Sequence, residues 1–181
     1  MYLNIVTPCS RPENLHLISK SINIPIANYR WLVVFDFDTL PHSELIPNNC
    51  ETFLHKNLNS CAGHAQRNYA LDLITMGHIY SNDDDTVLHP DLWENIKDVE
   101  ADFISFTQLN KDGTLRLKGD YIKLNNIDSH NFIVKRDTVG ETRFIISEYG
   151  ADGLFAEKCY SKATNKLFID KPLSVYNSLR T

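Results

Sequence analysis

Three consecutive aspartates, Asp83, Asp84 and Asp85, follow the apolar residues Ile79 and Tyr80 and are the strongest chemical signal in the chain. Neighbouring carboxylates repel one another, so a positive partner is expected to compensate them. Hard divalent cations take oxygen ligands and commonly join protein carboxylates to the phosphate oxygens of a substrate. The triplet therefore predicts a site for Mg²⁺ or Mn²⁺ beside a phosphorylated ligand. The alternative is a solvated acidic turn before the next helix.

A further carboxylate, Asp36, stands at the end of the apolar run of residues 29–35. A carboxylate at the end of a buried strand is costly unless it has a hydrogen-bonding partner. The N–H group of a nucleobase is one such partner, and the capping of a turn is the alternative. Asp36 is thus a candidate for base recognition.

Two arginines lie near the same expected strand ends. Arg67 comes early in the helix expected before the acidic triplet, where its planar guanidinium suits either a diphosphate or one of the carboxylates. A surface ion pair is the alternative for Arg67. Arg11 belongs to the loop of residues 7–11, where the first strand meets a helix N-terminus. Such an end favours anions and the polar groups of a ligand.

Alternating strand and helix patterns in the first 108 residues would bring these side chains together. Strands are expected at 3–7, 29–35, 50–55, 78–81 and 101–108, and helices at 62–76, at 90–96 and from the S-x-x-E capping box of residues 10–13 to residue 22. This alternation indicates an α/β sheet with a parallel core. Ligands of such sheets bind beyond the carboxyl ends of the strands, so the chemistry is expected just after residues 7, 35, 81 and 108.

The second part of the chain is less regular. It predicts an extended hairpin arm at 115–124, a strand at 131–135, a helix at 151–161 and a short strand at 167–169.

Composition excludes several classes of protein. The 181 residues hold 18 lysines and arginines against 23 aspartates and glutamates, and this acidity argues against nonspecific nucleic-acid binding. No apolar run approaches the roughly 18 residues of a membrane span, and no signal peptide is expected. Four scattered cysteines without a CxxC pair predict reduced thiols and a cytoplasmic protein. Only seven glycines occur, and the glycine-rich loops of dinucleotide-binding and P-loop proteins are absent.

Together these motifs resemble the GT-A fold glycosyltransferases, especially the family 2-like enzymes that use nucleotide-sugars. The resemblance covers residues 3–108 best and rests on Ile5-Val6-Thr7-Pro8-x-x-Arg11, the strand ending at Asp36, Gly63-x-x-x-Arg67-Asn68-x-Ala70, and Gly77-x-Ile79-Tyr80-x-x-Asp83-Asp84-Asp85 with His89-Pro90 beyond. It implies a GT-A α/β fold, a Rossmann-like mixed sheet with a parallel core flanked by helices. It also implies a single domain, 1–181, with a donor half at 1–108 and an acceptor half at 109–181.

The resemblance also implies a role for each motif. The aspartate triplet would be the DxD-type motif that holds the donor ribose and Mn²⁺ or Mg²⁺, with Asp85 and Asp83 on the metal. Asp36 would bind the base, usually uracil. The donor-binding set would be Thr7, Pro8, Arg11, Asp36, Arg67, Asp83 and Asp84.

On the acceptor side, Asp152 is similar in position to the catalytic base of these enzymes, and Glu148 is the second choice. An aspartate at this point can instead be the N-cap of the helix at 151–161. His130 and Asn131 precede a strand where family members contact the acceptor, although a structural polar role is the alternative for His130.

The resemblance predicts a hexosyltransferase-like enzyme that moves a sugar, with inversion, from a UDP-sugar to a hydroxyl of a glycan, a lipid-linked acceptor or a protein. Two other hypotheses remain. The sequence from Asp36 to Asp38 is similar to the DxD signature of haloacid-dehalogenase-type phosphatases, in which the first aspartate is the nucleophile and the second the acid/base. A nucleotide-sugar-binding module without turnover is the other.

Overall fold

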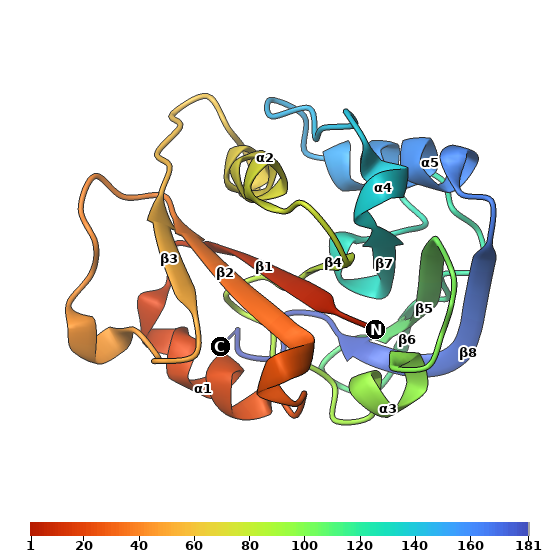
Figure 1. Ribbon diagram of the computed structural model, residues 1–181, viewed down its shortest axis with the longest axis horizontal. Helices are drawn as coiled ribbons and strands as arrows, with labels where there is room; N and C mark the ends of the chain where they lie inside the picture. Colours follow the sequence, from red (N-terminus) through yellow and green to blue (C-terminus); the bar gives the residue numbers. More distant parts are fainter. Residues whose placement is uncertain (181) are drawn as a thin grey trace.

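A mixed sheet forms the centre of the computed structural model, which describes residues 1–180 (Figure 1). Within these residues eight strands pair in the order β3-β2-β1-β4-β7-β5-β6, and β8 pairs with β5. The strands are β1 (Leu3–Cys9), β2 (Tyr29–Phe35), β3 (Glu51–Leu54), β4 (His78–Ser81), β5 (Phe103–Leu109), β6 (Leu115–Leu117), β7 (Phe132–Lys135) and β8 (Lys166–Val175). The expected mixed α/β sheet is confirmed, and its parallel core consists of β3, β2, β1 and β4.

Helices cover both faces of this sheet, as Figure 1 shows. The helices α1 (Leu15–Ser21) and α3 (Leu92–Ile96) lie on one face, where Ile18 and Trp93 pack in a core with Trp31 of β2. On the other face lie α2 (His64–Leu73), α4 (Arg136–Val139) and α5 (Ala151–Lys162). Because both faces are covered, β1 is buried along its whole length, as the apolar strand patterns predict.

Several boundaries differ from the sequence expectations. The first helix begins as a 3-10 turn at Pro12–Asn14, and the expected capping box between Ser10 and Glu13 does not form. The N-cap position is Arg11 instead of Ser10, and the Ser10 hydroxyl donates a hydrogen bond to Asp84 at 3.1 Å. The hairpin arm is reduced to the short β6, and the last strand, β8, is ten residues long because it pairs with β5 along most of its length.

The position of β7 decides where the second half of the chain meets the first. β7 lies between β4 and β5 and runs antiparallel to both. An antiparallel strand starts at the edge where its neighbour ends, so the turn before β7 lies beside the residues that follow β4. The hydroxyl of Tyr80 in β4 donates to the carbonyl of His130 in this turn, at 3.1 Å.

None of the helices in residues 1–180 is long and apolar enough to span a membrane.

Thr7 offers a test of the sheet's packing. The indole N–H of Trp31 donates to the Thr7 hydroxyl at 2.9 Å, and both side chains are fully buried. We expect Thr7→Val to leave this N–H unpaired and to lower the free energy of unfolding by about 1–3 kcal/mol in urea denaturation. Thr7→Ser keeps the hydroxyl and is the control. A Thr7→Val protein as stable as the Thr7→Ser protein would contradict this role.

Candidate active site

A cavity of about 530 Å³ opens at the carboxyl ends of β1, β2 and β4. This is the edge at which the sequence predicts the chemistry. Six aspartates and four arginines line it: Asp36, Asp83, Asp84, Asp85, Asp128 and Asp152, with Arg11, Arg67, Arg116 and Arg180. The carboxylates outnumber the guanidinium groups, so the cavity favours a cation together with any anionic ligand.

Asp84 holds the loop between β1 and α1 in place. Its buried carboxylate accepts hydrogen bonds from the backbone N–H groups of Ser10, at 2.6 Å, and Arg11, at 2.8 Å. The Arg11 side chain adds two contacts, through Nε at 2.9 Å and Nη2 at 2.7 Å. Because these groups already occupy both oxygens of Asp84, the geometry gives it a structural role in place of the predicted contact with the donor.

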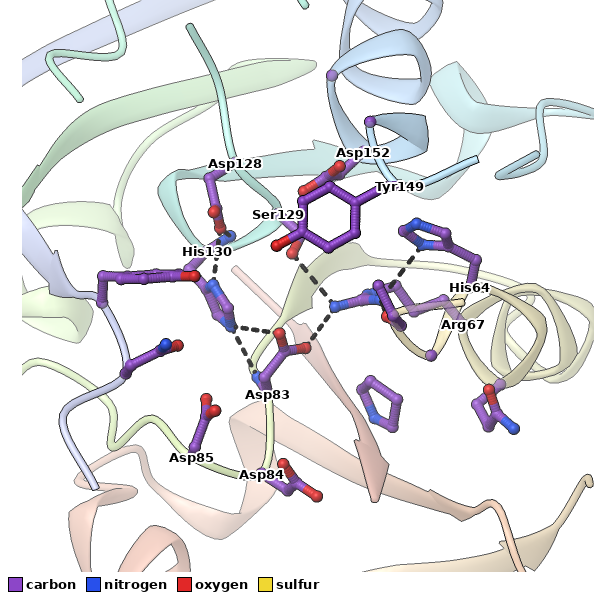
Figure 2. Close-up of a pocket in the computed structure, with 18 of the residues that line it drawn as sticks. His64, Arg67, Asp83, Asp84, Asp85, Asp128, Ser129, His130, Tyr149 and Asp152 are labelled. Carbon is purple, nitrogen blue, oxygen red and sulfur yellow. Dashed lines mark hydrogen bonds and ion pairs between the residues drawn. The ribbon is translucent and has the colours of Figure 1, made fainter. Parts of the chain in front are cut away.

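Asp83 forms the centre of an ion-pair network, shown by the dashed lines in Figure 2. The Arg67 guanidinium donates to one of its oxygens, and His130 Nε2 lies 3.2 Å from the other. Burial alone would raise the pKa of Asp83, but Arg67 and His130 outweigh it and lower that pKa to about 2. Asp83 therefore carries a negative charge that the protein itself compensates.

The His130 ring lies between two carboxylates. Its Nδ1 is 2.7 Å from Asp128, and its Nε2 faces both the carboxylate and, at 2.9 Å, the backbone nitrogen of Asp83. Burial acts to lower the pKa of His130, and an N–H donated to Nε2 favours the neutral ring. The carboxylates of Asp83 and Asp128 outweigh burial and raise that pKa to about 10. With the ring buried, this geometry supports the structural alternative for His130.

Asn131 does not line the cavity. Its amide oxygen accepts from the backbone N–H of Asp128, which completes a reciprocal capping box in the turn before β7. Its side chain is fully buried, so the predicted acceptor contact of Asn131 is not supported. The same holds for Thr7 as a donor contact, because its hydroxyl is buried against Trp31 outside the cavity. Pro8, by contrast, lines the cavity, and its contact with the donor stays a prediction.

Arg67 is buried in α2 and does not form the alternative surface pair. Besides Asp83, its guanidinium donates to the carbonyl of Ala62 and to the Ser129 hydroxyl, and it lies 5.7 Å from the centre of the Phe144 ring. The sequence predicts a diphosphate or a carboxylate as the partner of Arg67, and the structure shows the carboxylate of Asp83.

Asp85 is the aspartate of the triplet whose charge the protein compensates least. It is almost fully buried, yet its only charged partners among residues 1–180 are Arg11 Nη2 at 3.1 Å and Arg180 Nε at 3.8 Å. Burial and the nearby charge of Asp83 raise the pKa of Asp85. Such a carboxylate gains from a further cation. No three His, Cys, Asp or Glu side chains of the described residues are grouped closely enough to hold a metal alone, so a bound ion would need oxygens from its ligand.

Asp152 faces the cavity from the first turn of α5, on the opposite side from Asp84 and Asp85 (Figure 2). The N-cap of this helix is Gly150, so Asp152 is not the cap. Burial, and then the charge of Asp128, raise the pKa of Asp152. Glu148 is exposed and does not line the cavity.

The two carboxylates after β2 have different partners, and only Asp36 lines the cavity that contains the triplet. Asp36 is exposed at the edge of the cavity, where it accepts from the amide of Gln66 at 2.9 Å. Asp38 pairs with Lys56 at 2.6 Å in a separate shallow hollow. The phosphatase hypothesis needs Asp36 and Asp38 to act together beside the triplet, and this geometry does not favour it.

Several residues of the cavity gave no signal in the sequence. Ser129 and Asp128 come from the turn before β7, Tyr149 from the loop before α5, and the rest from β6 and the C-terminal segment: Arg116, Leu117, Tyr176, Asn177 and Arg180. Only an Asp-x-x-Asn cap at 128–131 could have indicated an ordered turn there.

Comparisons with known proteins show which proteins share this fold. No family model and no curated protein matches the sequence. Among solved structures, residues 1–349 of S. aureus TarS superpose with a TM-score of 0.79 at 15% identity, over 97% of this chain and 60% of that one. The same part of TarS in complex with UDP-GlcNAc gives 0.79 at 16% identity, over 97% and 58%.

A second protein, the mannosyltransferase PcManGT from Pyrobaculum calidifontis in complex with GDP-Man and Mn²⁺, gives a TM-score of 0.70 at 13% identity, over 97% of this chain and 56% of that one. This chain thus spans about three fifths of the length of these solved chains and 36% of the longer TarS structure. The likeness shows that the chain has the GT-A glycosyltransferase fold.

The raised pKa of His130 predicts how stability changes with pH. A group that is more basic when folded stabilises the protein fully below its unfolded pKa, about 6.5, and loses that contribution as pH rises through its folded pKa, about 10. Urea denaturation should therefore show wild-type stability falling between pH 7 and 9.5, by at most about 1.4 kcal/mol per pH unit. His130→Gln should show a flatter profile; equal slopes would mean that the ring is neutral in the folded protein.

Proposed function

We propose that this chain transfers a sugar from a nucleotide-sugar, of the UDP class, to a hydroxyl group with the help of Mn²⁺ or Mg²⁺. The observation that carries this proposal is the meeting of Asp36, Asp85 and Asp152 in one cavity at the carboxyl ends of the parallel strands. The fold, which is that of TarS with bound UDP-GlcNAc and of a mannosyltransferase with bound GDP-Man and Mn²⁺, supports the same class of ligand.

Charge explains why a divalent cation suits this cavity. A nucleoside diphosphate is anionic, and the cavity already contains more carboxylates than guanidinium groups. The residues fit a cation, because Asp85 is buried, shares its nearer counter-ion Arg11 with Asp84, and lies beside Asp83 in sequence. Asp85 would hold the ion, and Asp83 would share it or bind the donor ribose. A cation held there would supply positive charge to neutralise the departing diphosphate.

Asp36 is the proposed contact to the base. It lies exposed at the edge of the cavity, and the Gln66 amide orients one of its oxygens, so the other is free to accept a base N–H. Uracil carries one such N–H, which is consistent with a UDP-sugar.

Asp152 is the proposed general base, since it faces the triplet across the cavity (Figure 2). It would take the proton of the acceptor hydroxyl while the acceptor oxygen bonds to the anomeric carbon and the bond from that carbon to the diphosphate breaks. Attack from the side opposite the leaving group inverts the configuration. A raised pKa makes this carboxylate a stronger base than an ordinary aspartate.

The acceptor classes and the cytoplasmic location stay predictions.

The metal is tested by calorimetry with UDP. Wild-type protein should bind UDP with Mn²⁺ and bind it much more weakly in EDTA, because the diphosphate then meets uncompensated carboxylates. Asp85→Ala should bind UDP equally weakly with and without Mn²⁺. Asp38→Ala, which removes a carboxylate outside the cavity, should behave as wild type. UDP binding that is equally tight in EDTA would refute the metal's role, and hydrolysis of phosphate monoesters that Asp38→Ala abolishes would favour the phosphatase.

The base is tested by turnover. Release of UDP from UDP-sugars, measured with a panel of hydroxyl acceptors, should fall about 10²–10⁴-fold in Asp152→Asn, the usual loss for a positioned base. UDP affinity and melting temperature should stay near wild type, because this side chain is not the helix cap. Since the base works deprotonated, wild-type activity should fall as pH drops through a pKa above the ordinary value for aspartate.

Glu148→Gln is the matched control, because Glu148 lies outside the cavity. A fully active Asp152→Asn enzyme would show that the base is another residue. A wild-type protein that binds UDP but turns over none of the UDP-sugars would favour the binding module without turnover.

A further inference from the structure

The arginines that line the cavity differ in how far the protein already uses them. Arg11 makes short contacts to Asp84 and Asp85, and Arg67 is buried against Asp83. A guanidinium group held this way has few donors left for a ligand.

The guanidinium group of Arg116 is also held by contacts within the protein. It donates to Asp128 at 2.9 Å and to the side-chain oxygen of Gln108, and it stacks on the Tyr176 ring at 3.7 Å. Arg180 is the exception within residues 1–180. Its side chain is 60% exposed, and its one charged contact, to Asp85, is 3.8 Å long.

The main chain around Arg180 is nevertheless well fixed. The N–H of Leu179 donates to the carbonyl of Asp85 at 2.8 Å, and the Ser178 hydroxyl accepts from the N–H of Val87 at 3.0 Å. Lys111 donates to the carbonyl of Arg180 at 2.9 Å. Backbone and short side-chain contacts thus attach this segment to the loop after β4, while the Arg180 side chain stays free at the cavity.

We infer that Arg180 binds the diphosphate of the nucleotide donor and is the cavity's dedicated phosphate-binding arginine. This inference rests on the proposed function. A free guanidinium presents paired N–H donors that match phosphate oxygens, and it supplies a positive charge where carboxylates are in excess. Its place beside Asp85 puts the charge where a metal-bound diphosphate would lie. A diphosphate would also draw Arg180 away from Asp85 and leave that carboxylate to the cation.

The test compares UDP with uridine, which has the same base and ribose but no phosphate. In calorimetry with Mn²⁺, Arg180→Ala should bind UDP about 10–100-fold more weakly than wild type, the range of a lost charge-assisted contact. Uridine affinity, measured by NMR titration, should not change. Arg180→Lys keeps the charge but loses the paired donors, so its UDP affinity should lie between the two.

Two controls separate phosphate binding from structure and from overall charge. The melting temperature of Arg180→Ala should stay near wild type, because the contacts of its segment do not use the guanidinium group. Lys158→Ala removes one positive charge from an exposed position of α5 and should bind UDP as wild type does.

Each contrary outcome has a separate meaning. Wild-type protein that fails to bind UDP with either metal would overturn the proposed function, and this inference with it. Wild-type protein that binds UDP, with Arg180→Ala binding it equally well, would overturn the inference alone. Equal losses of UDP and uridine affinity in Arg180→Ala would also overturn it, because they would show that Arg180 shapes the site without contacting phosphate.

Discussion

The arrangement of the cavity depends on the compensation of three adjacent, largely buried carboxylates. Each leaves bulk water only if other charges or hydrogen-bond donors replace it. Asp84 takes backbone N–H groups and Arg11 from the first loop, and Asp83 takes Arg67 from α2 and His130 from the turn before β7. The triplet therefore ties three segments that are distant in the sequence to the end of β4.

The three aspartates differ in how far their charge is compensated. Two of them satisfy their charge inside the protein, and the network around Asp83 extends through His130 to Asp128. Asp85 receives a contact at 3.1 Å from Arg11, which also pairs with Asp84, and a longer contact at 3.8 Å from Arg180. The residue left least compensated by the fold is thus the one to which our proposal assigns the cation.

The antiparallel strand β7 connects the second half of the chain to the first. Because β7 starts where β4 ends, Asp128 and Ser129 reach the cavity from the second half of the chain. The helix α5 then follows over the same face as α2 and brings Asp152 opposite the triplet (Figures 1 and 2). One sheet with a reversed central strand therefore supplies both walls of the cavity.

The sequence by itself predicted the parallel core, the edge that holds the cavity and the aspartates after β2 and β4, because apolar strand runs and strand-end carboxylates are local patterns. It did not predict the burial of Thr7, the internal use of Asp84 or the capping box of Asn131, since these depend on partners more than twenty residues away or on a turn without apolar periodicity. Tertiary structure alone placed Arg116 and Arg180 at the cavity, because the pairing of β6 with β5 positions Arg116 and the pairing of β8 with β5 brings the end of the chain to Asp85. Local pattern thus determined which groups could do chemistry, and long-range pairing decided which of them remain free to do it.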